Sequence, residues 1–175
     1  MILGFDLSLS HSSCCHFVNQ TDFCFSDFDI LPKKTKEYEI EIEKDIVRYG
    51  WIADWVKEQI QKSPNLDQIG IEGLAFGATH SRAVTKLAGL QATVLGKIYN
   101  DFNKMIPLLI YPTECRKAYF GTIKDRDIGN LSRKEFVFKS LSTRHPQSIL
   151  NDHQADAYLI AYFIWKLQHN KPDEK

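Results

Sequence analysis

The spacing of apolar residues changes once near the start of the chain, and that change strongly limits the possible folds. The first thirty residues hold a short apolar run, MILGFD, and two aromatic-rich alternating segments, SSCCHFVN and DFCFSDFDI, separated by NQTD. Segments of this kind are typical of strands joined as a hairpin. From about 43 to 62 the apolar residues instead recur at spacings of three and four, as in an amphipathic helix. Three strands are therefore expected before the first helix.

Beyond residue 65, short apolar runs alternate with helical patterns. We expect strands at 66–72 and 105–112, helices at about 81–102, 131–144 and 151–168, a helical turn at 112–120, and loops at 31–42 and 121–130. Ser132 and Glu135 fit a capping box at the start of their helix. Three meandering strands followed by crossover units predict a mixed five-stranded α/β sheet with helices on both faces. This is the order of the ribonuclease-H-like fold.

Length and composition favour one ordinary globular domain. The 175 residues are 43% hydrophobic and 25% charged, so we expect a single domain at 1–168 and a short polar tail at 169–175. The start lacks a signal-peptide pattern, and no apolar run approaches the roughly 18 residues of a membrane span. The four cysteines show no CxxC pair, which predicts reduced thiols. Taken together, these features predict no membrane partner and a cytoplasmic location.

Charge is unevenly distributed along a chain whose formal net charge is zero. Residues 1–79 hold 7 Lys+Arg against 13 Asp+Glu, whereas residues 80–145 hold 12 against 5. A basic middle of this kind can form a surface that meets phosphate backbones. It can equally be scattered over solvated faces, and composition alone does not separate the two interpretations.

Two acids follow apolar strands directly. Asp6 ends the first strand and Glu72 ends the fourth. If these strands are parallel neighbours, the two carboxylates lie together at the edge where open sheets place their ligands. Such carboxylates repel unless a cation lies between them, and oxygen ligands suit magnesium or manganese. A lone acid at a strand end is more often a turn former or a cap, so the prediction depends on the combination.

The start of the last predicted helix supplies the third side of the site. Asp152, His153 and Asp156 lie close together on the first turn, whose positive dipole end favours carboxylates. Asn151 or Asp152 is also a good N-cap, and one of them is expected to have that role. The opposite, buried stripe of this helix is predicted to consist of Ala157, Ile160, Ile164 and Leu167.

These motifs resemble those of the RuvC family of Holliday junction resolvases. GFDLSLSHSS is similar to the first-strand motif of that family, IGIEGLAFG to its second motif and HQADAYLIAYF to its final helix. YPTECRKAYFGT and SRKEFVFKSL resemble its proline-containing segment and basic helix, so the likeness extends from residue 2 to about 165. Phe76 is one position later than the aromatic residue of many members, and His153 stands where many have Asp. The short form is most similar to phage-encoded members.

The resemblance implies a metal-dependent endodeoxyribonuclease that resolves Holliday junctions by symmetric nicking. Asp6, Glu72, His153 and Asp156 would be catalytic. Two Mg²⁺ ions, replaceable by Mn²⁺, would be bound by Asp6, Glu72, Asp156 and either His153 or Asp152. If the chain is phage-encoded, it would act in the host cytoplasm.

DNA contacts are expected from the basic middle of the chain. Phe76 would stack on or wedge against an unpaired base, unless it folds into the core. The predicted DNA-binding residues are Phe76, Arg82, Lys86, Arg116, Lys117, Lys124, Arg126, Arg133 and Lys134.

The helix at 81–102 carries two apolar faces where a surface helix needs one. Leu87, Leu90, Val94 and Ile98 form the first, and Ala88, Ala92, Leu95 and Tyr99 form the second. The second face predicts a homodimer through this helix, which would present two sites to the two symmetric strands of a junction.

Three alternatives remain at the level of sequence. One is a nuclease of the same fold with a broader preference for branched, flapped or hybrid substrates. Another is a non-catalytic junction-binding protein. A sugar-kinase or actin-like ATPase also opens with a Gly-x-Asp strand, but it needs a second phosphate loop and about twice the length.

Overall fold

A single mixed sheet of five strands organises the described part of the chain. In this computed structural model, residues 1–29, 41–74 and 82–169 are described. The strands are β1 (Ile2–Asp6), β2 (His11–Asn19), β3 (Asp22–Asp29), β4 (Gln68–Glu72) and β5 (Leu108–Ile110). Their order is β3-β2-β1-β4-β5, with β2 antiparallel to both β1 and β3, and with β4 parallel to both β1 and β5. The predicted ribonuclease-H-like sheet is therefore confirmed.

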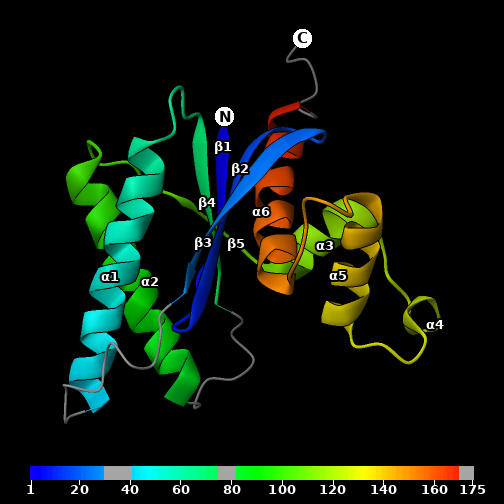
Figure 1. Cartoon of the computed structure of the whole chain (residues 1–175), viewed down its shortest axis with the longest axis horizontal. Helices are drawn as coiled ribbons and strands as arrows, with labels where there is room; N and C mark the ends of the chain where they lie inside the picture. The colour runs from blue at the N-terminus through cyan, green and yellow to red at the C-terminus, as the bar shows by residue number, and fades with distance from the viewer. Residues whose placement is uncertain (30–40, 75–81, 170–175) are drawn as a thin grey trace.

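Helices cover both faces of this sheet, as Figure 1 shows. They are α1 (Glu41–Gln61), α2 (Arg82–Asp101), α3 (Pro112–Phe120), α4 (Asp125–Ile128), α5 (Arg133–Arg144) and α6 (Asp152–His169). The first two pack together on one face, while α6 lies against the other face with α3 and α5 outside it (Figure 1). No helix within the described ranges is both long and apolar enough to cross a membrane.

The alternating side chains of β1 divide the core into two clusters. Leu3 and Phe5 are buried beneath α1 and α2, whereas Ile2 is buried on the side of α6. Because β1 is covered on both faces, its sequence is a continuous apolar run and not an alternation. All four cysteines are free, in agreement with the expected thiols.

The last helix is buried on more than the predicted stripe. Ala157, Ile160 and Ile164 are buried as expected, but Leu167 is 50% exposed. Tyr158 and Leu159, outside the predicted stripe, are fully or almost fully buried. The reason is that α3 and α5 cover the side of α6 that a simple surface helix would leave in water. Leu167 lies beside α3 but lines an open hollow between that helix and the end of α6.

Two segments differ from the expected elements. The strand expected at 105–112 is reduced to β5, which lies between Pro107 and Pro112, because proline cannot donate to a strand ladder. Pro112 instead occupies the first turn of α3, which is longer than the single turn expected. The short helix α4 lies in the predicted loop, and Gly129 ends it with a positive φ of 62°. The capping box of Ser132 and Glu135 is confirmed.

Gly4 sets the distance between β1 and α6. A Cβ atom at this position would lie 2.4 Å from the carbonyl oxygen of Ala157 and 2.7 Å from the amide nitrogen of Ala161. Both atoms belong to the backbone of α6 and cannot turn aside. A side chain here would therefore push the helix away from the sheet.

We expect Gly4→Ala to destabilise the protein by about 1–3 kcal/mol, because overpacking displaces backbone in a close-packed core. Chemical denaturation gives the measurement. Gly50→Ala is a matched control, since a Cβ on that α1 residue meets nothing within 4 Å. Alanine favours helix by about 1 kcal/mol over glycine, so the control should be stabilised. Equal stability of Gly4→Ala and the parent would contradict the close approach.

Candidate active site

The acids at the ends of β1 and β4 lie side by side because their strands are parallel neighbours. Phe5 is paired with Ile71 in the strand register, so Asp6 and Glu72 follow at the same edge. Their carboxyl groups lie close enough for Asp6 to raise the pKa of Glu72. Asp156 reaches the same point from α6, where it borders a small cavity together with Glu72 and Cys115. The structure thus brings the three predicted carboxylates together.

Burial and mutual repulsion disfavour the ionised forms of the carboxyl groups in this cluster. The pKa of Glu72 is raised to about 9, first by burial and then by its hydrogen bond to Asp6 and the charges of Asp6 and Asp156. The pKa of Asp156 is also raised by burial and by Asp6, although Arg116 and Lys134 oppose this. Three carboxylates in this state favour either a bound proton or a bound cation.

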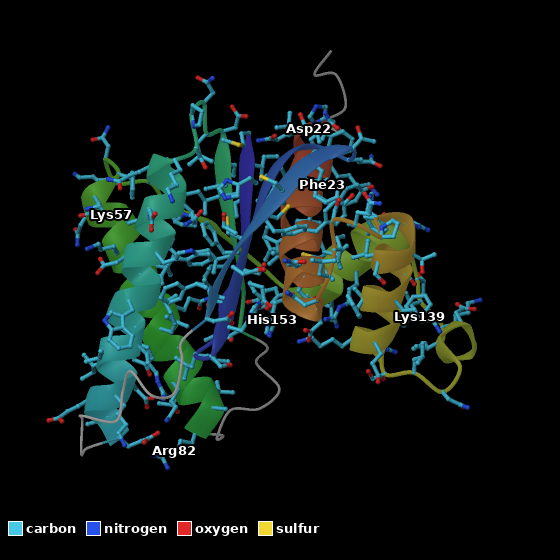
Figure 2. The ribbon with its side chains drawn as sticks, viewed as in Figure 1. Asp22, Phe23, Lys57, Arg82, Lys139 and His153 are labelled. Carbon is cyan, nitrogen blue, oxygen red and sulfur yellow. The ribbon has the colours of Figure 1, made fainter. Side chains whose placement is uncertain are left out.

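His153 faces Asp6 at the start of α6. Its Nδ1 lies 2.6 Å from Oδ2 of Asp6, and this hydrogen bond raises the pKa of the imidazole against the opposing effect of burial. Figure 2 shows His153 where α6 begins, next to the ends of the central strands. The side chain therefore belongs to the carboxylate cluster.

Asp152 contacts a lysine beside that cluster and not Asp6. Its Oδ2 lies 2.8 Å from Nζ of Lys134 on α5, and this contact lowers the pKa of the carboxyl group. The N-cap of α6 is Asn151, whose side-chain oxygen accepts a hydrogen bond from the backbone amide of Gln154 at 2.8 Å. The predicted capping role thus belongs to Asn151.

Two of the predicted DNA-binding residues border the carboxylates. Nη2 of Arg116, on α3, lies 3.4 Å from Oδ1 of Asp156, and Nζ of Lys134 lies 3.9 Å from Oδ2 of the same residue. These cations partly neutralise the cluster. The sequence placed both residues in a basic segment, but the contact with Asp156 arises only when α3 and α5 pack beside α6.

The other predicted DNA-binding residues are spread over more than one face. Lys86 forms ion pairs with Asp45 at 2.7 Å and Glu41 at 2.9 Å, so it joins α2 to α1. Arg82 begins α2 on the opposite face of the sheet from α5 (Figure 2). Exposed positions on the α3–α5 side are occupied by Lys117, Lys124 and Arg133. The side chain of Arg126, in α4, and the whole of Phe76 lie outside the described residues.

Sequence reasoning missed His11, whose ring centroid lies 4.8 Å from that of His153. The pairing of β1 with β2 indicates that His11 lies near the site. Asp6 is paired with Ser13 on β2, so His11, two residues earlier, projects from the same face just beyond the end of β1. This register cannot be read from the sequence before the pairing is known.

The donor chemistry of the cluster fits a hard divalent cation. Three carboxylates and one imidazole converge, and the pKa of Glu72 is raised by burial first and then by the neighbouring acids. Over the described ranges, no group of three His, Cys, Asp or Glu side chains is arranged to bind a metal ion without rearrangement. Asp6 is engaged by His153, and Asp156 by Arg116. Ion binding would therefore require these groups to exchange partners.

The fold and this cluster together define a ribonuclease-H-like α/β protein with acidic side chains at the carboxyl ends of its central strands. No family model and no curated protein sequence matches the chain.

Two solved structures share the fold over nearly the whole chain. The structure of Thermus thermophilus RuvC in complex with a Holliday junction substrate has 15% identity and a TM-score of 0.64, and the match covers 97% of this chain and 95% of the other. A second Thermus thermophilus RuvC structure has 16% identity and a TM-score of 0.63, with 96% and 95% covered. At these identities the likeness is one of fold.

Proposed function

We propose that the chain is a metal-dependent endodeoxyribonuclease that resolves Holliday junctions by symmetric nicking. The observation that carries this proposal is the convergence of Asp6, Glu72 and Asp156, with His153 on Asp6, at one edge of a RuvC-like fold. A RuvC of the same fold has been solved with a Holliday junction substrate. The acids of this cluster need a compensating positive charge. Divalent ions bound there would supply it and would also promote phosphodiester hydrolysis.

In this proposal Asp6, Glu72, Asp156 and His153 hold two Mg²⁺ ions, with Mn²⁺ able to substitute. The ions would supply an activated water and charge neutralisation at the leaving oxygen. Of the two candidates for the fourth ligand we favour His153, because it contacts Asp6 directly, whereas Asp152 pairs with Lys134, the cation that also borders Asp156. Arg116 and Lys134 would leave Asp156 when ions arrive and bind phosphate instead.

Substrate choice is tested with three nucleic-acid substrates at equal concentration in Mg²⁺: a four-way junction, a Y-shaped fork and an RNA–DNA hybrid. We expect paired nicks in the junction and little cleavage of the others. Comparable cleavage of junction and fork would favour a broader branched-DNA or flap endonuclease. Tight junction binding without cleavage in Mg²⁺ or Mn²⁺ would identify a non-catalytic junction-binding protein.

Lys86 and Lys117 are both candidate DNA contacts, and the structure separates them. Lys86 and Arg48 both pair with the buried Asp45. Lys86→Ala removes the closer of these two cations and should destabilise the protein by about 1–3 kcal/mol. Lys117 is exposed on α3. Lys117→Ala should leave stability within about 0.5 kcal/mol of the parent and lower the salt dependence of junction binding by about one unit of slope. Denaturation and binding titrations at several salt concentrations measure both, and the reverse pattern would contradict the assignment.

We further propose a homodimer through α2. Ala88, Ala92 and Tyr99 on its second face are exposed, as expected for a surface that meets a partner. The segment before the edge strand adds Ile106, which is 72% exposed and lines a shallow hollow with Leu95 and Tyr99. Leu109 of β5 is also exposed and is paired with Ile71, whose side chain lies on the α1–α2 side of the sheet. Together they form an apolar surface of the kind that marks an interface.

The expected mass in sedimentation equilibrium at micromolar concentration is twice that of the chain. Ala92→Arg places a charge in the centre of this surface and should yield the monomer, because an unpaired charge at an interface core is strongly unfavourable. Thr143→Arg, at an exposed position on α5, serves as the control and should remain dimeric. A parent protein of single-chain mass would refute the dimer.

A further inference from the structure

The imidazole of His153 lies between two groups from different strands. On one side its Nδ1 meets Asp6 of β1 at 2.6 Å. On the other, the ring of His11, the first residue of β2, lies at a centroid distance of 4.8 Å with the planes inclined by 35°. This spacing is within the range of direct contact between two aromatic rings. One histidine thus supports another at the edge of the carboxylate cluster.

His11 is itself anchored to the neighbouring strand. Its Nδ1 is bonded to Oδ1 of Asp29, the last residue of β3. The backbone on its other side is fixed by Ser8, whose side-chain oxygen accepts a hydrogen bond from the amide of His11 at 3.0 Å. The ring of His11 therefore has a defined place before it meets His153.

The next residue of α6 contacts the same hairpin. Nε2 of Gln154 donates to Oδ2 of Asp27 at 2.6 Å, and Oδ1 of Asp27 accepts a hydrogen bond from the hydroxyl of Ser13 at 2.5 Å. Oε1 of Gln154 in turn accepts from the amide of Leu150, immediately before the helix. Two successive side chains of α6 are therefore braced on β2 and β3.

His153 needs such a support because its helix position alone does not fix the ring. It lies in the first turn of α6 and is a quarter exposed. A partly exposed side chain with two rotatable bonds can turn into solvent unless both faces are restricted. Asp6 restricts one end of the ring through a hydrogen bond, and His11 restricts its face.

We propose that His11 is a positioning residue, which holds the His153 ring with Nδ1 on Asp6 and so leaves Nε2 for the ion or proton of the reaction. The part that concerns cleavage rests on the proposed function. His11 contacts His153 and makes no contact of its own with the carboxylates Asp6, Glu72 and Asp156 among the contacts described above. Loss of its ring should therefore misplace one group and leave the rest of the cluster assembled.

Three variants separate the ring of His11 from its hydrogen bond. His11→Ala removes both, His11→Phe keeps a ring without the bond to Asp29, and His11→Asn keeps a donor without a ring. Ser10→Ala is the matched control, since Ser10 is exposed and only its backbone amide makes a hydrogen bond, to Ser8. Thermal denaturation establishes that each variant is folded.

The first readout needs neither metal nor DNA. Proton and ¹⁵N NMR of the metal-free protein should detect a hydrogen-bonded Nδ1 proton of His153, assigned by its loss in His153→Gln. We expect this signal in the parent, His11→Phe and Ser10→Ala, and its loss by solvent exchange in His11→Ala and His11→Asn. An unchanged signal in His11→Ala, or no such signal in the parent, would overturn the proposal.

The second readout is junction cleavage. We expect kcat to fall about 10- to 100-fold in His11→Ala and His11→Asn with KM unchanged, because small misplacements of a reacting group have effects of this size. His11→Phe should retain most of the activity. If His11→Asn is active and His11→Phe is not, the ring contact is not the cause. If the parent itself does not cleave junctions, the proposed function fails, while the NMR comparison still decides the positioning.

Discussion

Asp6→Asn should abolish junction cleavage, with a loss of about 10³-fold or more, and leave junction binding nearly intact. Asp6 contacts both the other strand-end acid and His153, so its neutralisation removes one carboxylate ligand and the partner that orients the imidazole. Removing a group that stabilises several kcal/mol of transition-state charge has effects of this size. Binding should persist because the basic residues on α3 and α5 are unchanged.

Cleavage is measured with a labelled four-way junction in Mg²⁺, and binding with the same junction in EDTA. Asp22→Asn removes an exposed carboxylate from the far end of the sheet (Figure 2) and controls for the loss of one negative charge. It should cleave like the parent. An Asp6→Asn protein that cleaves at the parental rate would refute the assignment of the site, whatever its affinity for DNA.

The second large effect concerns pH and stability. The pKa of Glu72 lies near 9 in the folded protein and near 4.5 when unfolded. Between these values the folded state holds a proton that the unfolded state has released, so the stability of the metal-free protein should fall as pH rises through this window. The raised pKa values of Asp156 and His153 act in the same direction. One such proton gives at most about 1.4 kcal/mol per pH unit.

Glu72→Gln should weaken this pH dependence and abolish cleavage. The amide keeps the shape of the side chain and removes its titration, so the variant should be more stable than the parent at pH 8 and show a flatter pH profile. Mg²⁺ should raise the melting temperature of the parent by binding the folded state, and raise that of the variant less.

Thermal denaturation at pH 5 to 9, with Mg²⁺ and with EDTA, measures both effects. Glu114→Gln, an exposed acid at the start of α3, is the control and should keep the parental pH profile at the alkaline end. A parent whose stability does not change between pH 5 and 9 would show that the carboxylates are not coupled as described.

The relation between sequence and structure differs from one element to another. The mixed five-stranded sheet followed from the early change in apolar spacing, since a hairpin and two crossover units leave few right-handed arrangements. The ends of β1 and β4 could be placed because each apolar run stops at an acid. Leu167 was misplaced because its exposure depends on the extent to which α3 closes over the last turn of α6, where an open hollow remains. Local periodicity has no information about that extent.

The sequence by itself determined which side chains meet at the strand ends, because the covalent order and the strand direction bring Asp6 and Glu72 to one edge. Tertiary structure decided which of the adjacent residues Asp152 and His153 contacts Asp6. Neighbours on a helix point about 100° apart, so the packing of α5 draws Asp152 to Lys134 while β1 receives His153. The fold also gives the basic residues different partners. Lys86 forms ion pairs with acids of α1, whereas Arg116 and Lys134 form ion pairs with Asp156. Long charged side chains take their partners from whatever packs beside them, and only the folded chain specifies those neighbours.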